Sequence, residues 1–127
     1  MRLLLVFFIT LHFTSFSQVV RKENLTKKEN VYYDFEKFKL ESTGAYYKDL
    51  LGESRDKHGK WQYFDKEGKL IEERNYYRGK LHGPVKAYYS NGKMRQEGYF
   101  KLDEQDSVFR EWSETGELSV EGYYFKN

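Results

Sequence analysis

Three carboxylates recur at a fixed spacing along this chain, and their side chains are the ones best suited to acid–base chemistry. Glu73, Glu97 and Glu121 lie 24 residues apart. If the chain forms stacked two-strand units, equivalent positions are separated by two strand spacings, roughly 9–10 Å. Inverting glycosidases use a carboxylate separation in that range. Spacing alone raises no pKa, however, so pairing of each Glu with Lys or Arg across a sheet is the favoured interpretation.

Two histidines occupy a second register. His58 and His82 also lie 24 residues apart, and Asp106 follows in the third position. A separation of roughly 9–10 Å between equivalent positions is too large for one ion to bridge, because metal ligands form a close cluster. We therefore assign no metal ligand and no cofactor, and favour a role for these residues in turns.

Other catalytic patterns are missing from the sequence. The chain has no cysteine, no glycine-rich phosphate loop and no Ser-His-Asp order. Disulfides are therefore excluded as a source of stability. We assign no catalytic residue and predict that the protein is not an enzyme.

Aromatic side chains are the remaining candidates for a site. The chain contains 12 Tyr, 10 Phe and 2 Trp. Each large aromatic can remove ~150–250 Å² from water, so packing into a core is their first expected role. A stripe that stayed exposed on one face would instead bind protein or glycan. The candidate binding residues are Trp61, Tyr63, Tyr76, Tyr88, Tyr99, Trp112 and Tyr123.

Glycines define the elements that would position these side chains. Gly68, Gly92 and Gly116 lie 24 residues apart in the turn sequences DKEGK, SNGK and SETGE. The flanking segments are short and rich in Tyr, Phe, Trp and Val, which favours strands over helices. A period in the twenties indicates stacked repeats. We therefore predict an all-β fold, an elongated antiparallel sheet of about four successive β-hairpins.

An earlier segment extends the repeat. KLESTGAYYK (39–48) aligns with KMRQEGYFK (93–101), so that Gly44 corresponds to Gly98 and Gly122. Such strand glycines can let an aromatic side chain lie flat across the backbone. The predicted units cover about 31–58, 59–82, 83–106 and 107–127.

The first residues predict export. A single Arg2 precedes an apolar run, and Ser15 and Ser17 have the spacing that a signal peptidase reads. The run is too short to span a bilayer comfortably, although an uncleaved anchor is the alternative. The predicted organisation is a signal peptide at 1–17, a flexible tether at 18–30 and a repeat domain at 31–127. We expect a periplasmic or extracellular protein.

The charge balance argues against a nucleic-acid partner. The chain has 22 Lys and Arg against 20 Asp and Glu, and the two signs are interspersed. A balanced surface of this kind lacks the basic patch that nucleic-acid binding requires.

Three segments resemble a known family of repeats. GKWQYFDKEGKLIEE, HGPVKAYYSNGKMRQEGYF and FREWSETGELSVEGYYF are similar to MORN-repeat variants, and the nearest grouping is the YwqK-family antitoxins. The resemblance implies a ribbon of successive hairpins and leaves function open, because such arrays occur in proteins of many kinds. Two departures stand out: Ser107 replaces Gly59 and Gly83, and Arg74-Asn75 replaces the Glu-Gly register.

Several functions are compatible with these observations. The leading hypothesis is a non-enzymatic exported repeat scaffold that binds a protein partner. Alternatives are an envelope module for glycan or lipid head groups, and an antitoxin-like toxin neutraliser, which fits a leader peptide poorly. The open edge of the last strand predicts pairing with another chain or with a second copy.

The mature N-terminus tests the predicted location. Mass spectrometry of the protein recovered from expressing cells should find Gln18 as the first residue, because cleavage is expected after Ser17. An intact Met1 in the membrane fraction would support the anchor instead. An intact Met1 in the cytoplasm would contradict export and favour the antitoxin role.

Overall fold

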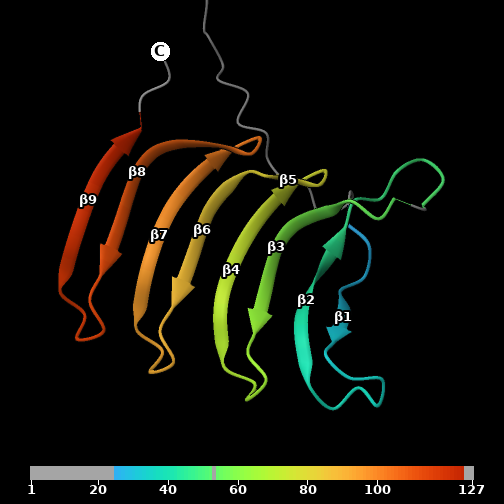
Figure 1. The fold of residues 1–127 in the computed structure, drawn as a ribbon. Coiled ribbons are helices and arrows are strands. Elements are labelled where there is room, and N and C mark those ends of the chain that lie inside the picture. The colour runs from blue at the N-terminus through green and yellow to red at the C-terminus, as the bar shows by residue number, and fades with distance from the viewer. Residues whose placement is uncertain (1–24, 53, 125–127) are drawn as a thin grey trace, which may run out of the picture.

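The computed structural model describes residues 25–52 and 54–124, which form one open antiparallel sheet (Figure 1). The strands are β1 (Glu29–Tyr32), β2 (Leu40–Tyr46), β3 (Lys57–Phe64), β4 (Leu70–Tyr77), β5 (Lys80–Leu81), β6 (Gly83–Tyr88), β7 (Met94–Lys101), β8 (Glu104–Trp112) and β9 (Leu118–Tyr124). Their order is β1-β2-β3-β4-β6-β7-β8-β9, and the short β5 pairs with β4. The hairpins β1–β2, β3–β4, β6–β7 and β8–β9 confirm the predicted all-β, four-hairpin fold.

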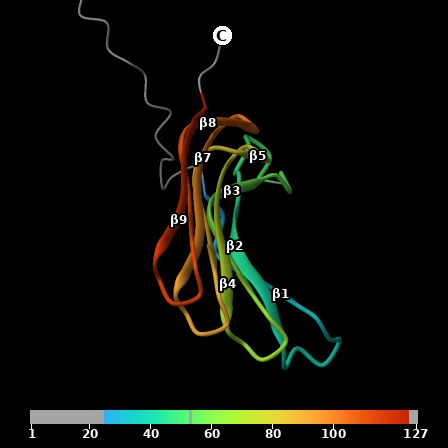
Figure 2. The ribbon, with the colours of Figure 1, turned by 60° about the vertical axis from the view of Figure 1, so that its left-hand side comes forward.

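The sheet is a single layer. Figure 2, a side view, shows the strands as one bowed ribbon with nothing packed on either side of it. No helix in the described part of the chain is long and apolar enough to cross a membrane. Apolar side chains must therefore be covered by neighbours on the same face of the sheet.

The ordered structure begins before the predicted repeat domain. Leu25 forms a bridge with Tyr47, and β1 includes Glu29 and Asn30, the last two residues of the predicted tether. The predicted signal peptide lies outside the described residues.

The turns at one end of the sheet repeat the same geometry. Gly68, Gly92 and Gly116 have φ angles of 83°, 84° and 99°, in the left-handed region that favours glycine. Each of their amides donates to the carbonyl three residues earlier, and the residue there donates back across the loop. This is a type I turn followed by a left-handed glycine. The three glycines thus share one backbone setting, as the 24-residue repeat predicts.

At the opposite end of the sheet, two-residue turns join successive units. Arg78-Gly79 and Leu102-Asp103 both have positive φ at both residues. Turns of this kind match the twist of the strands, and glycine is favoured in them. Leu102 and Asp103 adopt the same conformation with side chains that disfavour it, so the second junction is the more strained of the two.

A bulge recurs in the first strand of each later unit. Between β7 and β8, Tyr99 pairs with Asp106 but Gly98 pairs with Phe109, which leaves Ser107 and Val108 as extra residues. Ser107 has a φ of 64°, and its counterparts Gly59 and Gly83 also have positive φ. The departure noted in the sequence is therefore a serine that holds a conformation better suited to glycine.

The core is small and aromatic. Trp61 is fully buried, and its ring meets Tyr46 edge-on with centroids 5.1 Å apart. The indole Nε1 donates to the Ala45 carbonyl at 2.9 Å. Tyr76 completes the buried cluster, and the Lys57 ammonium lies 4.4 Å from the Trp61 ring centroid. The core therefore joins β2, β3 and β4.

Gly44 makes room for this indole. A Cβ at Gly44 would lie closer than 3.0 Å to three atoms of the Trp61 ring. The prediction that a strand glycine lets an aromatic side chain lie across the backbone is confirmed there. At Gly98 and Gly122 the nearest atoms would be 3.6 Å and 3.8 Å away, which is ordinary contact.

Alanine at Gly44 should therefore be far more damaging than alanine at Gly98. Gly44→Ala forces the indole out of its site, and we expect a loss of about 1–3 kcal/mol in the free energy of unfolding. Gly98→Ala is the matched control, a buried strand glycine whose new methyl group meets only ordinary contacts. Urea unfolding measures both. Equal losses in the two variants would contradict this account of the core.

Candidate binding site

A row of polar side chains crosses one face of the sheet, called here the ladder face. Cross-strand pairing places Gln62, Glu73, Lys86, Glu97, Arg110 and Glu121 side by side from β3 to β9. Glu97 lies between two cations, 3.6 Å from Lys86 and 3.9 Å from Arg110. Arg110 Nε donates to Glu121 at 2.6 Å.

This ladder decides the role of the three glutamates. A Lys or Arg stands between successive carboxylates, so the predicted cross-strand pairing is confirmed. The hydrogen bond from Arg110 lowers the pKa of Glu121. A general acid needs the opposite shift. The row therefore aligns strands, and offers no arrangement suited to carboxylate chemistry.

His58 supports a turn between units. The ring is buried, and its Nδ1 accepts a hydrogen bond from the Arg78 amide at 3.0 Å. It lies between Tyr47 and Tyr77, each with a centroid distance of 5.2 Å. His82 contacts the other side of Tyr77 at 5.8 Å. Within the described ranges, no three metal-capable side chains gather into one cluster.

Burial lowers the pKa of His58, and the positive charge of Arg78 lowers it further. The neutral ring accepts the Arg78 amide hydrogen at Nδ1. Protonation would remove that acceptor and place a charge in a buried site. The turn at Arg78-Gly79 therefore depends on a neutral histidine.

The aromatic residues predicted to bind do not form one surface. Trp61, Tyr63 and Tyr76 belong to the core, and the burial of Trp61 and Tyr76 removes their rings from contact with a ligand. The other four predicted residues follow the ladder residues along their strands and lie on the ladder face: Tyr88, Tyr99, Trp112 and Tyr123. A single aromatic stripe is thus replaced by a core on one face and separate rings on the other.

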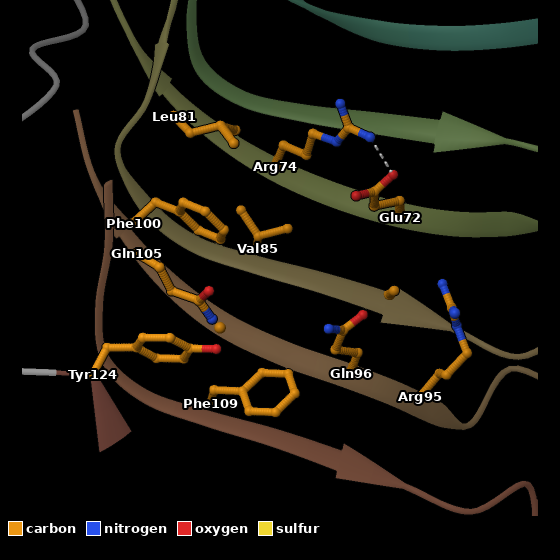
Figure 3. Close-up of a pocket in the computed structure, with 12 residues that line it drawn as sticks. Glu72, Arg74, Leu81, Val85, Arg95, Gln96, Phe100, Gln105, Phe109 and Tyr124 are labelled. Carbon is orange, nitrogen blue, oxygen red and sulfur yellow. Dashed lines mark hydrogen bonds and ion pairs between the residues drawn. The ribbon is translucent and has the colours of Figure 1, made fainter. Parts of the chain in front are cut away.

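The hollow in the sheet lies on the face opposite the ladder, called here the groove face. It is a groove of ≈ 490 Å³ that runs from β4 across β6, β7 and β8 to β9 (Figure 3). Its lining consists of Glu72, Arg74, Leu81, Val85, Ala87, Arg95, Gln96, Gly98, Phe100, Gln105, Phe109 and Tyr124.

The groove opens because later units carry smaller side chains than the core unit. Val85 occupies the repeat position of Trp61, and Ala87 occupies that of Tyr63. Gly98 stands where the preceding unit has Arg74. Less of the face is filled, so the sheet backbone and the rings of flanking residues become the floor.

The groove combines an apolar floor with a polar rim. Phe100, Val85 and Phe109 line its centre, and Phe109 meets Tyr124 edge-on at 6.4 Å. At one end, Arg74 donates to Glu72 at 2.7 Å. Side-chain amides of Gln96 and Gln105 also face the groove. Such a surface suits an apolar segment whose own polar groups need hydrogen-bond partners.

Most of these lining residues were missed from the sequence. Arg95 is an extra residue in β7, because Ala87 pairs with Gln96 but Tyr88 pairs with Met94. The bulge brings Arg95 to the groove beside Gln96. The available signal was Arg74, which interrupts a register that is otherwise glycine.

Comparison with known proteins fits this architecture. A family model described as MORN repeat variant matches residues 57–76 and 81–102. Residues 57–102 are MORN-type repeats. These segments contain β3 to β7, and the hairpin β8–β9 continues their turn geometry. Searches of curated proteins and of solved structures gave no match.

The pH dependence of stability should report on His58. Its folded pKa lies below the ordinary value of 6.5, so the unfolded chain binds more protons as pH falls through 6.5. The free energy of unfolding should therefore be constant above that pH and decrease below it. His58→Asn, whose amide oxygen can replace Nδ1, should flatten this decrease between about pH 7.5 and 5.5.

The control is His82→Asn, which retains His58 and should keep the decrease. Urea unfolding at several pH values measures all three proteins. A decrease of unchanged size in His58→Asn would show that another group causes it.

Proposed function

We propose that this protein is a non-enzymatic repeat scaffold that binds an extended segment of a protein partner in the groove. The observation that carries the proposal is the hollow of ≈ 490 Å³ on a sheet face that is otherwise filled by aromatic core. That volume lies within the range of ligand sites, ~300–1,000 Å³.

The shape of the groove favours an extended segment over a compact ligand. Its lining comes from five neighbouring strands, so the hollow is elongated across the sheet. Apolar side chains of a partner would rest on Val85, Phe100 and Phe109. Partner backbone groups would meet the amides of Gln96 and Gln105, which can both donate and accept.

The charges of the two faces favour protein over a lipid head group. On the ladder face, cations and carboxylates alternate, as Lys86, Glu97 and Arg110 show. In the groove, Arg74 is paired with Glu72. Anionic head groups attract clusters of one sign, and these surfaces offer mixed signs instead.

Export remains part of the proposal and rests on the leader sequence. A toxin would be one kind of protein partner, and it would use the same groove. The location of the mature chain therefore distinguishes an exported scaffold from a cytoplasmic neutraliser.

Photo-crosslinking from two adjacent aromatic positions tests the groove. Phe100 lines the groove, whereas Tyr99 is exposed on the ladder face of the same strand. We expect p-benzoylphenylalanine at position 100, introduced in the native cell, to crosslink a discrete protein partner. The same residue at position 99 is the matched control and should give at least several-fold less of that product.

Equal crosslinking from both positions, or crosslinking from position 99 alone, would place the partner elsewhere and refute the groove as its site. A melting temperature close to that of the parent protein shows that each variant is folded.

A further inference from the structure

The last strand of the sheet has an exposed edge with apolar side chains. In the described part of the chain, β9 has β8 as its one neighbouring strand. Leu118, Val120 and Tyr124 remain 54 %, 44 % and 47 % exposed. An open strand edge of this kind is a template for the addition of another strand.

The ladder indicates which charge an added strand should carry. At each earlier junction between units, a carboxylate meets a cation on the following strand: Glu73 pairs with Lys86, and Glu97 pairs with Arg110. Glu121 occupies the same register on β9. By the same pairing, a strand added to β9 would place Lys or Arg beside Glu121.

The neighbouring register indicates an apolar side chain. At the earlier junctions the residue before the cation faces the groove, and Phe109 pairs with Gly98 in this way. Gly122 is the corresponding residue on β9, and the nearest atom to a Cβ there would be 3.8 Å away in Phe109. A ring on an added strand could thus lie over Gly122, as Trp61 lies over Gly44.

We propose that β9 captures a β-strand of a protein partner by antiparallel addition, and that this strand carries a large apolar residue followed directly by Lys or Arg. The apolar residue covers Gly122 and extends the groove beyond Tyr124. The cation pairs with Glu121. This inference rests on the proposed scaffold function and names the class of partner segment.

A second copy of this chain is a poorer occupant. Pairing of β9 with the β1 edge of another copy would bring Asn30, the ladder residue of that strand, to Glu121. Pairing of β9 with β9 would supply a second Glu121 and no cation in the ladder register. Neither arrangement supplies the positive charge that every earlier junction with a carboxylate has.

A peptide with the sequence of β8 provides a defined probe. The nonapeptide EQDSVFREW (104–112) contains the apolar–basic pair and already shows this pairing with β7. We expect it to bind the full chain in isothermal titration calorimetry. Replacing the peptide's Arg by Glu, or its Phe by Ser, should weaken binding at least tenfold, because each change removes one of the two recognition contacts.

Charge reversal on the protein gives the matched test. Glu121→Lys should lose the parent peptide and gain the peptide with Glu in place of Arg. Glu117→Lys makes the same charge change in the adjoining turn, outside the ladder register, and should retain the parent preference. Hydrogen exchange should show new protection in residues 118–124 and unchanged protection in β8, which excludes exchange of the peptide for β8 itself.

Three results would overturn strand capture: equal binding of all peptides, the same effect from Glu117→Lys as from Glu121→Lys, or self-association through β9 that excludes the peptide. If the groove crosslinks persist while the peptide fails, only the strand proposal falls. If the peptide binds with the expected preference while Phe100 crosslinks fail, only the groove proposal falls.

Discussion

The contact between Trp61 and Gly44 is the constraint on which the rest of this structure depends. A single-layer sheet has no second layer to cover its apolar side chains, so it must bury them against its own backbone and neighbours. The indole does this by lying over a glycine of the adjacent strand and donating to the Ala45 carbonyl. This contact links the first hairpin to the second, and Tyr46 and Tyr76 pack around it.

The same constraint explains why the groove lies where it does. The repeat preserves backbone geometry while the side chain at the indole position changes to Val85 and then to Phe109. Arg74, which stacks over Tyr63 at 4.8 Å, gives way to Gly98 in the next unit. Stabilising contacts are thereby concentrated in the first two hairpins. The later hairpins keep the sheet continuous but leave its face open for binding.

The fold could be predicted because its signals are local. Left-handed glycines at a fixed spacing specify the turns, and those turns set the order of the strands. The distribution of side chains between faces could not be predicted, because it depends on bulges. Ser107 adopts positive φ without the residue type that signals it, and only its register with Gly59 and Gly83 marks the position. The bulge at Arg95 has no such marker, so the polar rim of the groove was missed.

The two faces divide the tasks of holding the sheet together and of binding. A shift of one residue between strands would move every ladder charge to the groove face, and every groove residue to the ladder face. Alternating charges along Glu73, Lys86 and Glu97 oppose such a shift, although exposed ion pairs contribute little to stability. Because register is fixed on one face, side chains on the other can differ between units without disturbing strand pairing. An array of nearly identical hairpins can in this way present a groove that is not itself repetitive.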